Sequence, residues 1–208
     1  MFTFTVYQTL EFPAIIGILK GKCIQLFAMS TIRFTTKLLT IGSTTLVHLP
    51  LSASKKLPSR GMVMVDGNIN GFDFQAPLEP DGKESHWFEV EKALLNGTGI
   101  KPGDTLTLTI TPSKNWPDPK IPKDFQEVLF ANTEAKKTWM DTTPLARWDW
   151  IRWIRSTKQP ETRKRRIEVA CSKLESGKKR PCCFNRNLCT QPSVSHNGIL
   201  LENTESKK

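Results

Sequence analysis

The feature that most constrains the fold is a change in hydrophobic periodicity across the segment "WPDPKIPKD", residues 116–124. Upstream of it, apolar and polar residues alternate, as in the "LTLTI" of residues 106–110. Downstream of it, apolar residues recur every three or four positions, as at Ile167, Ala170 and Leu174. Alternation predicts half-buried strands, and the longer period predicts amphipathic helices. The proline-rich segment predicts a stiff, extended linker. The chain therefore divides into a β unit followed by an α unit.

The β unit contains a hairpin signal, Asn70 followed by Gly71, between two alternating apolar segments. Both central residues of a type I′ turn need positive φ, which Asn and Gly adopt readily. Further strand-like segments cover residues 31–40, 72–78, 85–92 and 101–112. Residues 49–61 are expected to form a loop, because they are rich in Pro, Ser and Lys. About five short strands with one small helical turn fit either a small barrel or a sandwich.

The α unit shows start and stop signals for four helices. Pro122 suits the first turn of one helix, and Thr133 is the predicted N-cap of the next. Thr143, which precedes a proline, predicts the N-cap of a third helix. Pro160 predicts the first position of a fourth helix, which Gly177 ends.

Four of the six tryptophans lie in the α unit: Trp139, Trp148, Trp150 and Trp153. A small helical unit needs bulky apolar side chains, so we expect these tryptophans to fill its core. The alternative is a platform for base stacking or peptide docking beside the arginines of the same unit.

Nearly the whole net charge of +10 belongs to the α unit. Residues 33–112 carry eight basic and eight acidic side chains, whereas residues 120–181 carry sixteen basic and eight acidic ones. The basic run at residues 163–166 precedes an apolar stripe that begins at Ile167. We interpret the run as the polar surface of an amphipathic helix. Because a basic surface attracts anions of any kind, this interpretation does not exclude binding.

The sequence contains none of four common catalytic or nucleotide-binding motifs: G-x-x-x-x-G-K-[ST], G-x-G-x-x-G, H-E-x-x-H and G-x-S-x-G. His86 and Trp87 are the candidate cleft residues of the β unit, since a histidine can act as an acid or base near neutral pH. His86 has no evident partner in the sequence, so a surface or rim position is expected. We therefore predict no catalytic residue and no cofactor.

The five cysteines are an odd number in a chain long enough for a sizeable core, which does not indicate a disulfide framework. A reducing, cytoplasmic setting is expected. Four residues near the C-terminus are of types that can bind a metal: Cys182, Cys183, Cys189 and His196. Their spacing matches no zinc pattern, so no metal site is predicted.

Both ends of the chain differ from the two central units. Residues 1–29 are apolar, but Pro13, Lys20 and Lys22 interrupt them short of the ~20 residues of a membrane span. No basic segment precedes the apolar part, as a signal peptide would require. We expect a weakly ordered extension and no membrane span. Residues 181–208 lack sustained periodicity and are rich in Asn, Ser and Thr, which predicts a disordered tail.

The segment "WIRSTKQPETRKRRIEVACSKLESGKK", residues 153–179, resembles the W-I-x-x-A-K-x-x-E-T-R-x-x-R-I pattern of the YdeI/OmpD-associated, or bacteriocin-protection, family. Lys158, Glu161, Arg163 and Arg166 fall on positions of that pattern.

Upstream, residues 65–90 and 99–110 are similar to the uncharacterised domain that often precedes this helical module. The resemblance implies a double-split barrel of the AbrB/MazE kind for that domain. For the module it implies a role in bacterial resistance to bacteriocins or cationic peptides, and association with an outer-membrane porin. It brings no catalytic residues.

The predicted fold is therefore α+β, with a small, double-split-like β-barrel followed by a small all-α helical module. The predicted divisions are an N-terminal extension over residues 1–29, the barrel over 30–113, the linker over 114–122, the helical module over 123–180 and the tail over 181–208.

The predicted function is that of a non-enzymatic binding protein in stress or peptide resistance, which docks a protein partner. The candidate partner-binding or ion-pair residues are Lys158, Glu161, Arg163 and Arg166. Arg163 and Arg166 flank the apolar stripe, so we expect at least one to be held by a carboxylate such as Asp149 or Glu161.

The alternative is a nucleic-acid-binding regulator that uses the basic helical half and an AbrB-like barrel. No recognition helix with base-reading residues stands out, and glutamates at i, i+4 spacing offset several of the basic residues. We therefore expect only weak, sequence-independent DNA binding. An enzyme with His86 in a barrel cleft is the third possibility.

Overall fold

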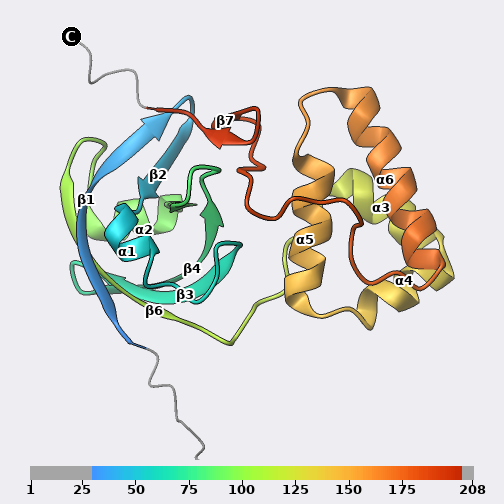
Figure 1. Ribbon diagram of the computed structural model, residues 1–208, viewed down its shortest axis with the longest axis horizontal. Coiled ribbons are helices and arrows are strands. Elements are labelled where there is room, and N and C mark those ends of the chain that lie inside the picture. The colour runs from blue at the N-terminus through green and yellow to red at the C-terminus, as the bar shows by residue number, and fades with distance from the viewer. Residues whose placement is uncertain (1–29, 203–208) are drawn as a thin grey trace, which may run out of the picture.

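The computed structural model describes residues 30–202, which form a β-barrel beside a group of four helices (Figure 1). The predicted α+β class and the order of barrel followed by helical module are confirmed. The N-terminal extension predicted for residues 1–29 lies outside the described residues, as do residues 203–208.

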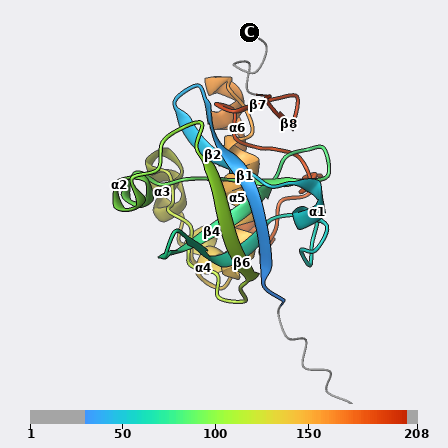
Figure 2. The ribbon, with the colours of Figure 1, turned by 90° about the vertical axis from the view of Figure 1, so that its left-hand side faces the viewer.

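The barrel has six strands: β1 (Ile32–Ile41), β2 (Thr44–His48), β3 (Val63–Ile69), β4 (Phe72–Pro80), β5 (His86–Glu89) and β6 (Thr105–Pro112). They close in the order β1-β2-β5-β4-β3-β6, and every neighbouring pair is antiparallel. Strand β1 closes the barrel because its first part, residues 32–37, pairs with β6 and its last part, residues 38–41, pairs with β2 (Figure 2). This double pairing makes the unit a barrel and not a sandwich.

Alternation along the strands fills the barrel interior. On β6, Leu106, Leu108 and Ile110 are buried, while Thr105 and Thr107 are exposed. The predicted hairpin is confirmed, since Asn70 and Gly71 adopt φ values of 51° and 87° between β3 and β4. Positive φ at both positions is what a type I′ turn requires.

Two short elements of the barrel were not predicted from the sequence. Strand β2 follows a tight turn at Gly42, and helix α1 (Leu51–Ser54) lies within the segment expected to be a loop. Both elements are brief, and periodicity is a weak signal over four or five residues. Helix α2 (Lys92–Thr98) occupies the predicted helical turn.

The helical module contains α3 (Lys123–Ala131), α4 (Thr133–Met140), α5 (Pro144–Arg155) and α6 (Pro160–Glu175). Thr143 caps α5 as predicted, because its hydroxyl accepts a hydrogen bond from the backbone N–H of Ala146. The predicted cap of α4 is wrong by one residue. Asn132, rather than Thr133, accepts the hydrogen bond from the N–H of Ala135 at 2.9 Å.

The tryptophans of the module divide into two groups. Trp139 and Trp150 are buried in the core with Phe125 and Leu129, as the prediction of core tryptophans expected. Trp148 and Trp153 are only partly buried.

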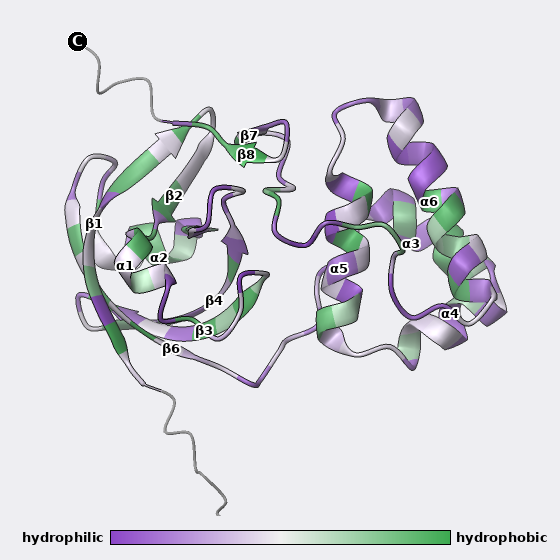
Figure 3. Cartoon of the chain, viewed as in Figure 1, coloured by the Kyte–Doolittle hydropathy of each residue, from purple (hydrophilic) through white to green (hydrophobic). Residues whose placement is uncertain are grey.

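The prediction of a disordered tail is wrong for residues 181–202. This C-terminal segment crosses from the end of α6 to the top of the barrel, where it forms the strand pair β7 (Ser195–His196) and β8 (Ile199–Leu200) (Figures 1 and 3). Val194 and Leu200 pack with Trp87 of the barrel in a small apolar cluster. A few well-placed apolar residues therefore hold the segment without any sequence periodicity.

Candidate functional site

The candidate site is a cleft of about 500 Å³ between the α5–α6 loop and the C-terminal segment. We call it the basic cleft. Its lining side chains come from the C-terminal end of α5, the loop that follows, α6 and the C-terminal segment; those used below are Trp153, Ser156, Lys158, Arg166, Cys183 and Leu188.

Arg166 is held in place by the C-terminal end of α5. One terminal nitrogen of its guanidinium donates to the backbone carbonyl of Trp153 at 2.8 Å and to the hydroxyl of Ser156 at 2.6 Å. The guanidinium also lies 5.6 Å from the centre of the Trp153 ring. A cation at this end of a helix satisfies carbonyls that have no partner within the helix and opposes the negative end of its dipole. Arg166 therefore joins α6 to α5 and places positive charge in the cleft.

Among the described residues, the charged side chains that line the basic cleft, Lys158 and Arg166, are both cationic. They line it together with His196, and none of the described residues that line it is Asp or Glu. Asn185, Asn197 and Ser156 add side chains that can donate hydrogen bonds. A concave site with cations and no carboxylate raises the local concentration of anions.

The C-terminal segment, which forms part of the cleft, also carries exposed apolar side chains. Leu188, Ile199 and Leu201 are 37%, 36% and 39% exposed, which is unusual for three large apolar residues in one short segment. Leu188 lines the cleft and lies beside Gly198, the residue that precedes Ile199. Grouped apolar exposure of this kind is typical of interaction surfaces.

The structure separates the four predicted ion-pair residues. Lys158 and Arg166 both line the basic cleft, whereas Glu161 is exposed at the start of α6. Arg163 forms a bidentate ion pair with Asp124 of α3, at 2.7 and 2.9 Å. The expected carboxylate is therefore present, but it is neither of the two that we named, Asp149 and Glu161. Asp149 instead pairs with Arg186 and Arg180 of the C-terminal region.

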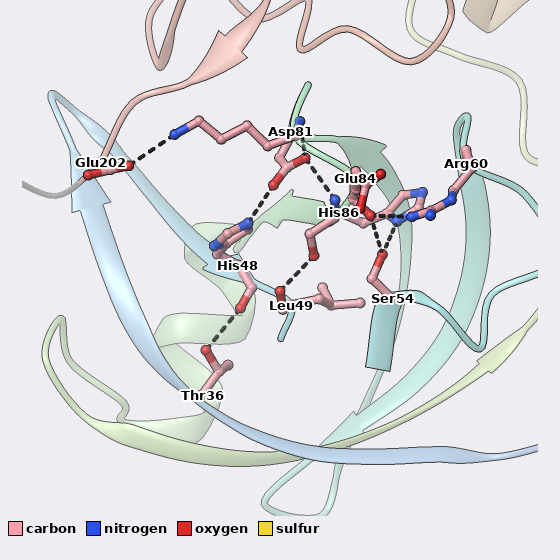
Figure 4. A network of polar contacts seen from close by, with 11 residues as sticks. Thr36, His48, Leu49, Ser54, Arg60, Asp81, Glu84, His86 and Glu202 are labelled. Atoms are coloured by element: carbon pink, nitrogen blue, oxygen red, sulfur yellow. Dashed lines mark hydrogen bonds and ion pairs between the residues drawn. The ribbon is translucent and has the colours of Figure 1, made fainter. Parts of the chain in front are cut away.

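The predicted rim position of His86 is wrong, because its side chain is fully buried. The Nδ1 atom accepts a hydrogen bond from the hydroxyl of Ser54 at 2.7 Å (Figure 4). The Nε2 atom donates to the carbonyl of Gly61 at 2.8 Å. Burial lowers the pKa of His86, and the carbonyl of Gly61 opposes this only in part. The neutral imidazole of His86 therefore has a structural role, because it holds α1 and the following loop to β5. Trp87, the next residue, points the other way and packs under the C-terminal segment.

Asp81 organises the turn before β5 in the same region. Its carboxylate accepts hydrogen bonds from the backbone N–H groups of Lys83 and Ser85 and from the His48 imidazole (Figure 4). Burial raises the pKa of Asp81, but these hydrogen bonds outweigh it and the pKa is lowered overall. These contacts give the buried Asp81 carboxylate a structural role in the turn.

A buried charge cluster joins the barrel, the helical module and the C-terminal segment. Arg152 of α5 is fully buried and donates to the backbone carbonyls of Arg186 and Leu188, each at 3.1 Å. Its Nε lies 3.7 Å from the carboxylate of Glu79 on β4. Arg155 hydrogen-bonds the same carboxylate and the hydroxyl of Thr190. We call this group the junction cluster.

The sequence contains a local signal for the junction cluster. Arg152 and Arg155 lie three residues apart in a helix that is otherwise mostly apolar on that side, so they share a face. Cations inside an apolar face need a buried carboxylate. The signal does not name the partner, because Glu79 is more than seventy positions away.

Two further observations apply to residues 30–202. No helix in this range is long and apolar enough to cross a membrane. Nor does this range bring three His, Cys, Asp or Glu side chains into a group that could hold a metal ion.

Comparison with known families agrees with the resemblance found in the sequence. Residues 118–177, from the linker to just beyond the end of α6, match the model of the family described as Bacteriocin-protection, YdeI or OmpD-Associated. Residues 34–110, most of the barrel, match a domain of unknown function, DUF1905. A search of curated proteins found no match to the chain. The helical module, which contributes Lys158 and Arg166 to the cleft, thus belongs to the bacteriocin-protection, YdeI or OmpD-associated family, and the barrel before it is a DUF1905 domain.

Proposed function

We propose that this protein is a non-enzymatic binding protein that docks an acidic segment of a protein partner in the basic cleft, as part of a bacteriocin-protection role. The observation that carries the proposal is the cleft itself, which contains Lys158 and Arg166 and, within residues 30–202, has no carboxylate in its lining. Both residues also fall on the family pattern. A partner with a negative charge fits this surface, and a cationic one does not.

The occupant is proposed to be a peptide segment and not a small anion. A small anion would contact Lys158 and Arg166 alone and leave the neighbouring apolar surface exposed. A segment with acidic and apolar side chains would also cover Leu188, Ile199 and Leu201. Burial of apolar area contributes about 25 cal/mol per Å², so these leucine and isoleucine contacts would add to the charge-assisted hydrogen bonds.

A binding role without catalysis is supported by the polar groups of the cleft. Its charged residues Lys158 and Arg166 suit recognition of an anion, and neither is set against a general base. Cys183 and His196 both line the cleft, but among the described residues no hydrogen bond joins them. The four described cysteines are free, which fits the proposed cytoplasmic setting.

The test uses a fluorescein-labelled peptide of alternating Glu and Leu, with the matching Gln and Leu peptide as the control ligand. Wild-type protein is expected to bind the acidic peptide and not the neutral one in an anisotropy titration. The double variant Lys158→Gln with Arg166→Gln is expected to lose about tenfold or more in affinity, because charge-assisted hydrogen bonds contribute about 1.5–3 kcal/mol.

The matched control variant is Lys164→Gln with Arg165→Gln, which removes the same charge from an exposed part of α6 outside the cleft lining. It should bind the acidic peptide nearly as well as wild type. Equal losses in both double variants would mean that general charge, and not the cleft, attracts the peptide. Because Arg166 also holds α5, the single variant Lys158→Gln gives an independent reading without disturbing that contact.

The nucleic-acid alternative is tested in the same titration with mixed-sequence duplex and single-stranded oligonucleotides. Phosphate contacts release counterions, so binding that depends on them weakens steeply with salt. We expect only weak binding, lost at physiological salt. Sub-micromolar binding that persists there and discriminates between sequences would favour a regulator over a protein-docking role.

A further inference from the structure

Cys182 lies beside a lysine at the surface, just after α6. The Nζ atom of Lys173, in the last turn of α6, donates a hydrogen bond to the sulfur of Cys182 at 3.0 Å. Cys182 is exposed, and so is its neighbour Cys183. Cys183 also lines the basic cleft. Two adjacent thiols and an ammonium group are thus accessible at one place.

The four described cysteines differ in their surroundings. Cys171 and Cys189 are buried, and burial raises the pKa of both thiols, that of Cys171 to about 11. At Cys182 the hydrogen bond from Lys173 lowers the pKa of the thiol. The thiolate is the nucleophilic form of cysteine, so the surroundings favour reaction at Cys182 and disfavour it at the two buried cysteines.

The sequence around Cys182 is rich in positive charge. Lys178, Lys179 and Arg180 follow shortly after the end of α6, and Lys173 contacts the sulfur itself. Asp141 pairs with Lys179 and Asp149 lies near Arg180, so part of this charge is offset. Lys173 remains directed at the thiol. An exposed thiolate next to cations, with a second thiol adjacent, is the pattern of redox-sensitive cysteines.

We propose that Cys182 is a redox modification site, which hydrogen peroxide oxidises and which then forms a mixed disulfide with an anionic low-molecular-weight thiol. The site is distinct from peptide docking in the basic cleft, so the proposal does not depend on the proposed function. The positive charge of Lys173 favours both the thiolate and the approach of a thiol that carries carboxylates.

The chemistry proceeds in two balanced steps. The Cys182 thiolate attacks one peroxide oxygen, the O–O bond breaks, and two electrons pass from sulfur to peroxide. The products are the sulfenic acid and hydroxide. The thiolate of the small molecule then attacks the sulfenic sulfur, the S–O bond breaks, and the hydroxide that leaves takes up a proton to form water. The product is a disulfide between Cys182 and the small thiol.

An external thiol is favoured over Cys183 for the second step. Consecutive Cα atoms are about 3.8 Å apart across a trans peptide, whereas disulfide-bonded cysteines usually have Cα atoms at least about 4.4 Å apart. A disulfide between Cys182 and Cys183 would therefore be strained. Cys183 serves as the control thiol, because it is also exposed and, among the described residues, accepts no hydrogen bond from a lysine, although the charge of Lys173 acts on it at longer range.

The first measurement compares the two thiols in single variants of the full chain. Cys183→Ser retains Cys182, and Cys182→Ser retains Cys183. At pH 7, iodoacetamide should alkylate Cys182 severalfold faster than Cys183, as followed by mass spectrometry of the peptide that contains them. The difference should disappear above about pH 10, where both thiols are ionised. Lys173→Met in the Cys183→Ser background should abolish the advantage at pH 7.

The second measurement treats the same variants with hydrogen peroxide and reduced glutathione. Cys182 should acquire glutathione and Cys183 should acquire little, and dimedone added in place of glutathione should trap the sulfenic acid on Cys182. Equal alkylation of the two thiols at pH 7, or an unchanged rate after Lys173→Met, would overturn the proposal. If Lys173→Met does not fold, the comparison of Cys183→Ser with Cys182→Ser decides the proposal by itself.

Discussion

Arg163 and Arg166 lie three residues apart on α6 and have different partners. Arg166 holds the end of α5 and lines the basic cleft, whereas Arg163 holds Asp124 at the start of α3. The side chains of the Arg163–Asp124 pair are 28% and 49% exposed. Solvent screening therefore limits what the pair contributes, even though its geometry is bidentate.

We expect Arg163→Ala to lower the free energy of unfolding by under about 1 kcal/mol, because the lost ion pair is partly exposed. Arg165→Ala, in the exposed part of the same basic run, should leave stability unchanged. The measurement is urea unfolding at pH 7. A loss of about 3 kcal/mol at Arg163 would contradict the exposed character of the pair.

The same pair predicts a pH dependence. The hydrogen bond from Arg163 lowers the pKa of Asp124 below its value in the unfolded chain. Its stabilising contribution is therefore present above about pH 4 and is lost as the pH falls through the folded-state pKa. Wild type and Arg163→Ala should become equally stable at acidic pH. If wild type remains more stable than Arg163→Ala at acidic pH, the packing of the Arg163 side chain, and not its charge, accounts for the difference in stability.

His86 predicts a dependence of the same sign, but in a window nearer neutral pH. Its folded-state pKa lies below the unfolded value of about 6.5, because burial disfavours the charged imidazole. As the pH falls below about 6.5, the unfolded chain gains a proton that the folded protein does not. Stability from this residue should therefore fall by up to about 1.4 kcal/mol per pH unit.

The measurement is urea unfolding of wild type and His86→Gln at pH 7 and pH 5. The variant will be less stable at pH 7, but it should lose less than wild type on acidification. Ser54→Ala is the control, because it removes the hydroxyl that contacts Nδ1 and leaves the imidazole buried. It should keep the pH dependence. If His86→Gln loses as much stability as wild type between pH 7 and pH 5, groups other than His86 cause the pH dependence.

At the scale of elements, the C-terminal segment behaves as part of the core. It covers Trp87 with Val194 and Leu200, and its backbone carbonyls at residues 186 and 188 accept hydrogen bonds from Arg152. The segment thus provides acceptors for a buried guanidinium that would otherwise lack them.

Adjacent leucines of this segment give a direct prediction. Leu200→Ala should lower the free energy of unfolding by about 2 kcal/mol or more, because Leu200 is buried against the barrel. Leu201→Ala should change it by under about 0.5 kcal/mol, since Leu201 is exposed. Thermal melts followed by circular dichroism make the comparison. Equal melting temperatures would mean that the segment does not pack on the barrel in solution.

At the scale of the whole molecule, the junction cluster couples the two units. Glu79 belongs to the barrel, while Arg152 and Arg155 belong to the helical module. Removing one partner from a buried charge pair leaves an uncompensated charge and costs about 3–5 kcal/mol. The two units are therefore expected to unfold together in the wild-type protein.

We expect Glu79→Ala to destabilise the protein by about 3 kcal/mol or more and to separate the unfolding of the helices from that of the barrel. Far-UV circular dichroism reports mainly the helices, and tryptophan fluorescence reports both units. The matched control is Glu89→Ala, which removes an exposed glutamate from the neighbouring strand β5. Coincident transitions and similar stabilities for the two variants would show that the units fold independently of the cluster.

Local patterns in the sequence predicted most of the elements and the order of the two units, although they missed β2, α1 and the β7–β8 pair. Alternation placed most strands, the Asn70–Gly71 pair placed the hairpin, and Thr143 placed the start of α5. These signals act within a few residues, because backbone preference and the burial of one face decide them locally. The motif also supplied Lys158 and Arg166, two of the residues that line the cleft.

Only the tertiary structure decided which distant groups meet. Closure of the barrel depends on β1 pairing with both β2 and β6, and the carboxylate for Arg163 comes from Asp124, 39 positions away. The same holds for buried His86 and for the C-terminal segment, whose few apolar residues show no period. Such contacts depend on the packing of surfaces that are complete only after the elements form, so no local pattern in the chain encodes them.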